Sequence, residues 1–366
     1  MSVHAPARVP SIDTLRGFVM VLMALDHVRD FFTSARFDPL DLSQTSAPLF
    51  LTRWITHFCA PTFVLLAGVS AYLVSLRCSR VELSRFLFTR GLWLVALEVT
   101  LMSLIWTFNF RYDQGLFLQV IWAIGMSMMG LAVLVHLPLR AIAIFSIVVM
   151  CCHNLLDGVE PQTLGAWAPV WSLLHVPGPI PHAFVNYPLI PWIAVMSLGY
   201  CVGALFELDQ YQRVLRFMWL GAAALVAFVV LRAPNVYGDP SDWTLQSTTL
   251  RTLLSFVNVQ KYPPSLLYLL ITLGVGFLSL ALFDSARGKV SGVLRTFGRV
   301  PLFFYVLHIA LAHFAATVVD SALRSGGFSL PVVYLAWVLV VATLYPACRW
   351  FAAVKRRRSD WWLSYL

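Results

Sequence analysis

Long apolar runs alternate with short polar stretches along the whole chain. Ten of these runs reach the length of roughly 17–25 residues that a helix needs to cross a bilayer. They predict spans over residues 13–33, 48–75, 86–108, 115–136, 139–156, 187–206, 214–232, 263–283, 300–320 and 330–352. We therefore expect an all-α fold, a polytopic membrane bundle of about ten transmembrane helices that forms a single transmembrane domain over residues 1–366.

The positions of lysine and arginine give an independent check on these spans. With the N-terminus placed in the cytoplasm, 18 of the 26 basic residues fall in or beside the predicted inner loops. This bias follows the positive-inside rule, which sets the orientation of membrane proteins. It supports an even number of spans with both termini in the cytoplasm.

The composition agrees with a membrane protein and excludes several other classes. The chain is 59% hydrophobic and 12% charged, whereas soluble domains are about 45–50% apolar and about 25% charged. The net charge of +9 lies beside hydrophobic ends, so it reflects orientation in the bilayer, and we expect no nucleic-acid partner. The six cysteines show no spacing typical of metal ligands, so we expect no metal.

The end of the first span carries four ionisable side chains in five residues, Asp26-His27-Val28-Arg29-Asp30. A charge inside a bilayer is costly and therefore faces a cavity or a partner. At helical spacing Asp26 and Asp30 share a face with Arg29, and histidine titrates near neutrality. The cluster indicates a proton-handling site. An internal salt-bridge cluster with Arg29 or Arg53 that fixes helix packing is the alternative.

Further polar residues fall on the same predicted outer side. Arg53 and His57 lie in the outer half of the second span, where Pro61 interrupts the backbone hydrogen bonds of the helix. His308 lies near mid-depth in the ninth span. We expect these spans to direct titratable groups toward one outer or mid-membrane cavity.

The segment Asn258-Val259-Gln260-Lys261-Tyr262-Pro263-Pro264 opens the eighth span. Proline is common at the start of a helix, where free N–H donors and the positive end of the dipole attract anions. With Lys261 beside it, this helix start is a candidate anion site. A proline-started helix with a snorkelling lysine is the alternative.

Several stretches resemble a known family. They are Ser11–Gly17, Asp26–Asp30, Phe58–Gly68, Asn258–Leu270 and Gly298–His308. They are similar to the bacterial members of the heparan-α-glucosaminide N-acetyltransferase-like family, multi-pass proteins of the inner (cytoplasmic) membrane within the broader group of transmembrane acyltransferases. The resemblance covers most of the chain. Its most specific parts are the first two spans and the Lys261–Pro264 step.

The resemblance implies transfer of an acetyl or acyl group from cytoplasmic acyl-CoA, with acetyl-CoA as donor, to a hydroxyl or amine of an outer-face acceptor such as a carbohydrate. Lysosomal relatives use a histidine in the loop after the first span, but here that loop, residues 33–47, contains none. His27 or His57 is then the candidate base, with Asp26 or Asp30 orienting the ring.

Other residues are candidates for binding. Arg16 and the basic inner loops are candidates for the CoA phosphates. Candidates near the acceptor or the developing oxyanion are Arg29, Arg53, Asn258, Gln260, Lys261, Tyr262 and His308.

Two other function classes remain open. A proton-coupled transporter would use the same Asp26, His27 and His57 cluster, although we find no internal repeat of the kind that many transporters show. A non-catalytic structural membrane protein would use the cluster only to pack helices. The sequence leaves the acceptor, the acyl chain and a homodimeric state undetermined.

Overall fold

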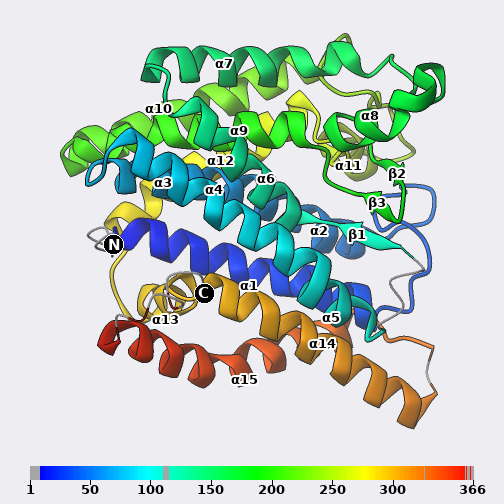
Figure 1. Ribbon diagram of the computed structural model, residues 1–366. Coiled ribbons are helices and arrows are strands. Elements are labelled where there is room, and N and C mark those ends of the chain that lie inside the picture. Colours follow the sequence, from blue (N-terminus) through cyan, green and yellow to red (C-terminus); the bar gives the residue numbers. More distant parts are fainter. Residues whose placement is uncertain (1–8, 110–114, 325, 359, 361–362, 364–366) are drawn as a thin grey trace. The chain divides into compact units, whose positions relative to one another are not determined.

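The computed structural model describes residues 9–109, 115–324, 326–358, 360 and 363. Within this part of the chain the protein is a polytopic helical membrane protein (Figure 1). The chain forms two compact units. We call Val9–Cys59, Trp243–Asn258 and Leu282–Leu366 the α1 unit, and Ala60–Asp242 with Val259–Ala281 the α12 unit.

Helix α1 is the centre of the α1 unit, where it packs against α13, α14 and α15. It buries Leu15, Val19 and Val28 completely. The elements of this unit are α1 (Pro10–Phe32), α2 (Ala47–Ile55), the 3₁₀ turn η1 (Thr56–Phe58), α11 (Thr249–Val257), α13 (Lys289–Gly298), α14 (Pro301–Leu323) and α15 (Leu330–Arg357).

Two glycines allow α1 and α13 to touch backbone to backbone. A Cβ atom on Gly17 would lie 1.8 Å from the carbonyl oxygen of Leu294, and one on Gly298 would lie 1.8 Å from that of Asp13. Any other residue at either position would force the helices apart, because interiors are packed too densely to absorb such an overlap.

The α12 unit is built from a larger number of helices, among which α4 packs on α6, and α9 packs on both α6 and α7. Its elements are α3 (Cys59–Ser75), α4 (Arg80–Leu97), the π-helical turn η2 (Glu98–Met102), α5 (Ser103–Thr107), β1 (Leu116–Leu118), α6 (Val120–Leu134), α7 (Leu139–Cys152), η4 (His153–Leu156), η5 (Pro161–Trp167), α8 (Ala168–Leu174), β2 (Gly178–Ile180), β3 (Ala183–Val185), α9 (Leu189–Val202), η6 (Gly203–Glu207), α10 (Gln210–Arg232) and α12 (Leu266–Ser285).

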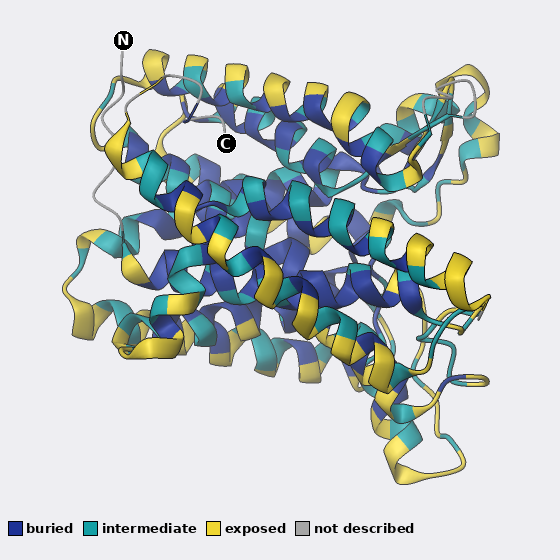
Figure 2. Cartoon of the chain, turned by 90° about the horizontal axis from the view of Figure 1, so that it is seen from below, coloured by how far each residue is buried: buried dark blue, intermediate teal, exposed yellow. Residues whose placement is uncertain are grey.

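Eight of the described helical segments are long and apolar enough to cross a membrane. They are Ala47–Ser75, Arg80–Thr107, Leu139–Leu156, Leu189–Glu207, Gln210–Arg232, Leu266–Ser285, Pro301–Leu323 and Leu330–Arg357. The other two expected spans also form helices: α1 carries five charged side chains in 23 residues, and α6 is 15 residues long. Few residues of helices α10 and α15 are buried, as expected for helices that face lipid. Figure 2 shows how buried, intermediate and exposed positions are distributed along the chain.

The two long connections are more ordered than loops. Residues 157–186 hold η5, α8, β2 and β3, and 233–262 hold α11. Strand β3 pairs in parallel with β1 and antiparallel with β2, giving the order β1-β3-β2. Strand β1 also takes the first residues of the span expected at 115–136, so the helix begins only at Val120.

Candidate functional site

A pair of histidines joins α1 to α14 in the α1 unit. The Nδ1 atom of His27 lies 2.7 Å from the Nε2 atom of His308. The two rings are nearly parallel, at 13°, and Tyr305 lies edge-on to both. The side chain of His308 is fully buried, whereas that of His27 is partly exposed.

The backbone of α14 decides which nitrogen of His27 carries a proton. The Nδ1 atom of His308 lies 2.9 Å from the carbonyl oxygen of Phe304, which can only accept a hydrogen bond, so Nδ1 of His308 is the donor. In neutral His308 the Nε2 atom is then an acceptor, and His27 must donate to it from Nδ1. Neutral His27 therefore has its basic lone pair on Nε2.

The carboxylates beside His27 are bound by arginines. The Nη2 atom of Arg29 lies 3.0 Å from Oδ1 of Asp26 and 2.5 Å from Oδ1 of Asp30, and Nη1 of Arg53 lies 2.5 Å from Oδ2 of Asp26. Asp26 and Arg29 are buried, whereas 48% of the Asp30 side chain is exposed. The ion-pair cluster considered from the sequence is thus present, and Nδ1 of His27 donates its orienting hydrogen bond to Nε2 of His308.

Two hydrogen-bond donor atoms of Arg29 are unused within the described part of the chain. Its Nε and Nη1 atoms are buried and donate no hydrogen bond to any residue that the structure describes. A buried donor without a partner is rare in proteins and calls for a ligand, a water or a functional reason. Arg29 therefore keeps a positive charge and two unfilled donors in the buried part of the α1 unit.

His57 lies in η1, the turn that separates α2 from α3, and η1 packs against α1. Only 2% of the His57 side chain is exposed. Pro61 lacks the N–H that would bond to the carbonyl of His57 four residues earlier, which accounts for the break in the helix at this point. The sequence prediction of an interrupted helix here is confirmed.

Arg16 and Asn258 have structural contacts of their own. Arg16 pairs with Asp13 at 3.5 Å and donates to the carbonyl of Gly298 at 3.4 Å, at the opposite end of α1 from His27. The side-chain amide of Asn258 donates to the carbonyl of Leu40 at 3.2 Å and so fastens the loop that follows α1.

Gln260, Lys261 and Tyr262 belong to the α12 unit. The backbone N–H of Gln260 donates to Asp239 at 2.8 Å, and the Tyr262 and Tyr187 hydroxyls are 3.4 Å apart. Only 8% of Lys261 is exposed, and its Nζ lies 5.1 Å from the centre of the Tyr262 ring.

The expectation of free N–H donors at this helix start is wrong. Helix α12 begins at Leu266, after both prolines, and its first three amides already have acceptors. Leu266 donates to Oδ1 of Asn154 at 2.8 Å, Leu267 to the carbonyl of Gly238 at 2.9 Å, and Tyr268 to Oγ of Ser265 at 3.0 Å. Tertiary contacts cap the helix, so only the lysine remains of the candidate anion site.

One buried acid of the α12 unit escaped the sequence reasoning. Glu98 is a lone acid in an apolar run, and its carboxylate accepts from the amides of Gln119 and Trp122 at the start of α6. The single acid inside an apolar run was the sequence signal that could have found it, because a charge in a membrane span faces a cavity or a partner. In the structure Glu98 lies in a π-helical turn, a feature frequent at functional sites.

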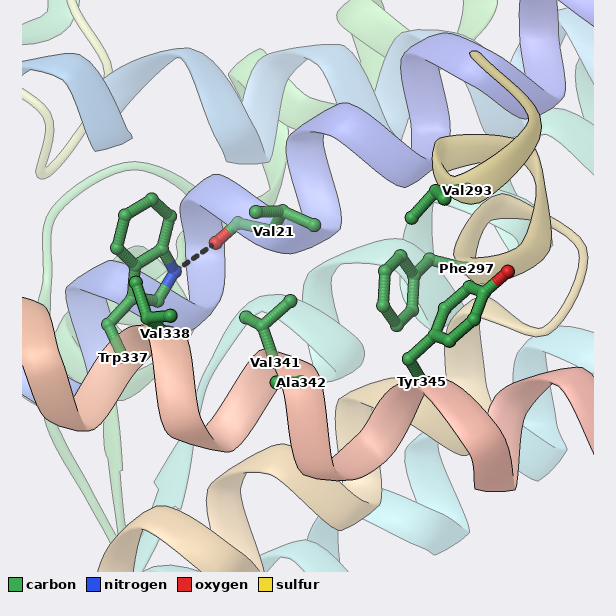
Figure 3. A pocket seen from close by; sticks show the side chains of 8 residues that line it. All are labelled: Val21, Val293, Phe297, Trp337, Val338, Val341, Ala342 and Tyr345. Carbon is green, nitrogen blue, oxygen red and sulfur yellow. Dashed lines mark hydrogen bonds between the residues drawn. The ribbon is translucent and has the colours of Figure 1, made fainter. Parts of the chain in front are cut away.

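A shallow apolar groove of about 390 Å³ lies elsewhere in the α1 unit (Figure 3). The residues that line it are Val21, Val293, Phe297, Trp337, Val338, Val341, Ala342 and Tyr345. None of them is a predicted site residue, and the Trp337 indole is occupied by a hydrogen bond of 2.8 Å to the carbonyl of Val21. Such a surface suits contact with lipid tails.

Comparison with known proteins identifies a family over more than half of the chain. Residues 8–234 match the family model described as heparan-alpha-glucosaminide N-acetyltransferase, catalytic. A search of curated proteins returns no significant match. The matched region includes α1 with His27 and the whole cluster formed by Asp26, Arg29, Asp30 and Arg53.

Proposed function

The chain belongs to the heparan-α-glucosaminide N-acetyltransferase family, a family of membrane acetyltransferases, and on this premise we propose that it transfers an acetyl group from acetyl-CoA to a hydroxyl or amine of a small acceptor, preferably a carbohydrate. We propose the bacterial inner membrane as its location, with the donor reaching it from the cytoplasm and the acceptor from the outer face.

The observation that supports this reaction best is the His27–His308 pair. The Nε2 lone pair of His27 accepts the proton of the acceptor as its oxygen or nitrogen attacks the thioester carbonyl. The new bond to the acetyl carbon forms, the carbon–sulfur bond breaks, and His27 returns the proton to the departing CoA thiolate. The reaction needs no acyl-enzyme, which agrees with the lack of histidine in residues 33–47.

Arg29 supplies the hydrogen-bond donors that stabilise the oxyanion formed by the attack. Negative charge develops on the carbonyl oxygen of the thioester, and preorganised donors lower the barrier most when they are already aimed at that oxygen. The Nε and Nη1 donors of Arg29 have no acceptor among the described residues, and the guanidinium is held in place by Asp26 and Asp30. We assign Arg29 to the oxyanion, while Arg53 holds Asp26.

The donor would enter from the other end of α1. Arg16 lies eleven residues before His27, which is about 16 Å along a helix. We assign Arg16 to the CoA phosphates, so that the pantetheine arm has to cover this length between Arg16 and His27. His57 is the alternative base, and Asn258, Gln260, Lys261 and Tyr262 are assigned to the acceptor side.

The first test is binding of acetyl-CoA to the detergent-purified chain by thermal shift, with free CoA and ATP as controls. We expect stabilisation by micromolar acetyl-CoA, because a ligand that binds only the folded state raises its stability by mass action. Absence of a shift at millimolar acetyl-CoA would favour a transporter or a structural protein instead.

The second test is turnover, measured as release of the CoA thiol with a panel of sugar acceptors. Loss of a general base lowers the rate by about 10²- to 10⁴-fold. We expect His27→Ala and His57→Ala to abolish turnover while the protein keeps its fold and still binds acetyl-CoA. Full activity in both variants would contradict the assignment of these histidines.

A further inference from the structure

We propose that the apolar groove beside α15 binds one acyl chain of an anionic phospholipid, and that Lys289 and Arg349 bind the phosphate of its head group. The proposal concerns the surface of the α1 unit alone and does not depend on the reaction proposed above. It assigns a specific occupant to a groove whose walls by themselves indicate only lipid tails.

Three helices of the α1 unit form the walls of the groove. Val21 belongs to α1, Val293 and Phe297 belong to α13, and the other five lining residues, from Trp337 to Tyr345, belong to α15. Trp337 lies at one end of the groove, and Val293 and Tyr345 lie at the other end (Figure 3). None of the lining side chains is charged, so the walls suit a hydrocarbon chain.

The length of the groove matches an acyl chain. Trp337 and Tyr345 are eight residues apart in α15, which corresponds to about 12 Å along a helix axis. One leaflet contributes half of the hydrocarbon core of a bilayer, or about 15 Å. Because α15 is long and apolar enough to cross the membrane, a chain that follows it fills the groove over most of the depth of a leaflet.

Two exposed cations flank the end of the groove that Val293 and Tyr345 form. Lys289 lies four residues before Val293 in α13, and Arg349 lies four residues after Tyr345 in α15. Residues four apart on a helix are neighbours on the same face. Both cations are exposed, and neither forms a hydrogen bond or an ion pair with a residue that the structure describes. Both charges are therefore available to a ligand at this end of the groove.

The helices at this end carry charge of one sign. Helix α13 contains Lys289 and Arg295, α15 contains four basic residues, and neither helix contains an acidic residue. The charge bias of the sequence places α13 and the end of α15 on the cytoplasmic side. Basic clusters beside a span attract the anionic lipids of that leaflet, so the charge of this region is complementary to such a head group.

A ligand must carry both a charge and a chain to use the whole site. A free phosphate would contact the cations alone, and a lipid without net charge would use the groove alone. When two binding groups are linked in one molecule, the second contact becomes intramolecular and the overall binding is stronger. An anionic phospholipid therefore has the chemistry that this site recognises.

The test is a thermal-shift titration of the detergent-purified full chain with dioleoylphosphatidylglycerol, dioleoylphosphatidylcholine and glycerol phosphate. The two lipids have the same acyl chains and differ in net charge, and glycerol phosphate supplies the charge without a chain. The first variant is Lys289→Gln/Arg349→Gln. Its control is Arg287→Gln/Arg357→Gln, which removes two exposed cations of the same region that do not flank the groove.

A second variant tests the groove itself. Ala342→Phe fills the groove, because Ala342 is one of its lining residues. Thr343→Phe is the control, because Thr343 is an exposed neighbour that does not line the groove.

We expect half-maximal stabilisation of the wild type at an about 30-fold lower mole fraction of phosphatidylglycerol than of phosphatidylcholine, because each cation near an anionic head group contributes about fivefold. The preference should disappear in Lys289→Gln/Arg349→Gln, and also at about 1 M salt, where the screening length is about 3 Å. Ala342→Phe should weaken the response to both lipids. Both control variants should respond as the wild type does.

Five outcomes would overturn the proposal. Equal responses of the wild type to the two lipids, an undiminished preference in Lys289→Gln/Arg349→Gln, or an equal loss in its control would each contradict the assigned cations. A response to glycerol phosphate as strong as that to phosphatidylglycerol would indicate a phosphate site that needs no lipid. An undiminished response in Ala342→Phe would contradict the groove as the site of the acyl chain.

Discussion

His27 donates from Nδ1 to Nε2 of His308 across 2.7 Å, and His308 donates in turn to the carbonyl of Phe304. A backbone carbonyl of α14 thereby sets the protonation of a side chain on α1. Because the carbonyl cannot reverse its role, the direction of both hydrogen bonds is fixed while the two rings are neutral.

His308 acts on turnover through His27, so replacement of His308 should slow the reaction. His308→Phe removes the acceptor for His27, so that both tautomers of His27 become populated, and we expect kcat to fall about 10- to 100-fold, as for other residues that orient a functional histidine. His308→Gln retains an acceptor oxygen and should recover part of the rate. The measurement is kcat and KM against pH for both variants.

The pH profile separates this role from a loss of stability. A positioning residue should change the pH dependence of kcat and leave KM for acetyl-CoA nearly constant. His313→Phe is the control, because His313 lies on the same helix and stacks on Phe31, with ring centres 4.6 Å apart. An equal loss of rate in the control would argue against a specific role for His308.

The two carboxylates of the cluster should differ in their effect on stability. Asp26 is buried between Arg29 and Arg53, and breaking a buried ion pair from one side costs about 3–5 kcal/mol. Asp30 is half-exposed, so solvent screens its pair with Arg29 and Asp30→Asn should cost less than about 1 kcal/mol. Equilibrium unfolding in mixed detergent micelles measures both.

Asp30→Asn is thus the internal control for Asp26→Asn. Equal losses of unfolding free energy in the two variants would show that the buried ion pairs are not what the cluster contributes to stability.

The contact between α1 and α13 should tolerate no side chain at Gly17. Gly17→Ala places a methyl group 1.8 Å from the Leu294 oxygen, and overpacking of this kind costs about 1–3 kcal/mol or more. Gly292→Ala lies within α13 and meets no atom within 4 Å, so alanine should raise stability by up to about 1 kcal/mol. The melting temperatures of the two variants should therefore move in opposite directions.

Low pH should lower the stability of the α12 unit, because Asp157 becomes protonated. Burial alone would raise the pKa of this carboxyl, but hydrogen bonds from His175 at 2.9 Å and from Asn154 at 2.7 Å outweigh it, and the pKa lies below the usual 3.8. When folding lowers the pKa of a carboxyl, the group stabilises the folded state fully at pH values above its pKa in the unfolded state. That stability is lost as the pH falls through the lowered folded pKa.

Asp157→Asn removes this proton-linked term. The stability of the wild type should fall more steeply than that of the variant as the pH decreases below 3.8, and the two curves should converge in strong acid. The measurement is unfolding free energy against pH in detergent. Parallel curves would contradict the assignment.

The helices could be predicted from the sequence because the length of an apolar run is a local property. The expected span 187–206 is observed as Leu189–Glu207, and 330–352 as Leu330–Arg357. The small sheet escaped prediction because strands of three residues, such as β1, carry almost no periodic signal. The prediction of free N–H donors at the start of α12 failed for a different reason, because Asn154 and Gly238 reach these donors only through the tertiary fold.

In the candidate site, too, local contacts could be predicted from the sequence and long-range contacts could not. The pairing of Asp26 with Arg29 follows from helical spacing and was among the expectations. The pairing of His27 with His308 spans 281 positions, and no pattern in a single sequence links residues so far apart.

The same 281 positions set an order of events during biosynthesis. His27 emerges from the ribosome well before α14, the helix that carries its acceptor. A nascent or prematurely terminated chain therefore has the histidine but no fixed tautomer. On the proposed mechanism the enzyme becomes competent only after α14 has been synthesised and inserted, so that chains that lack α14 do not consume acetyl-CoA.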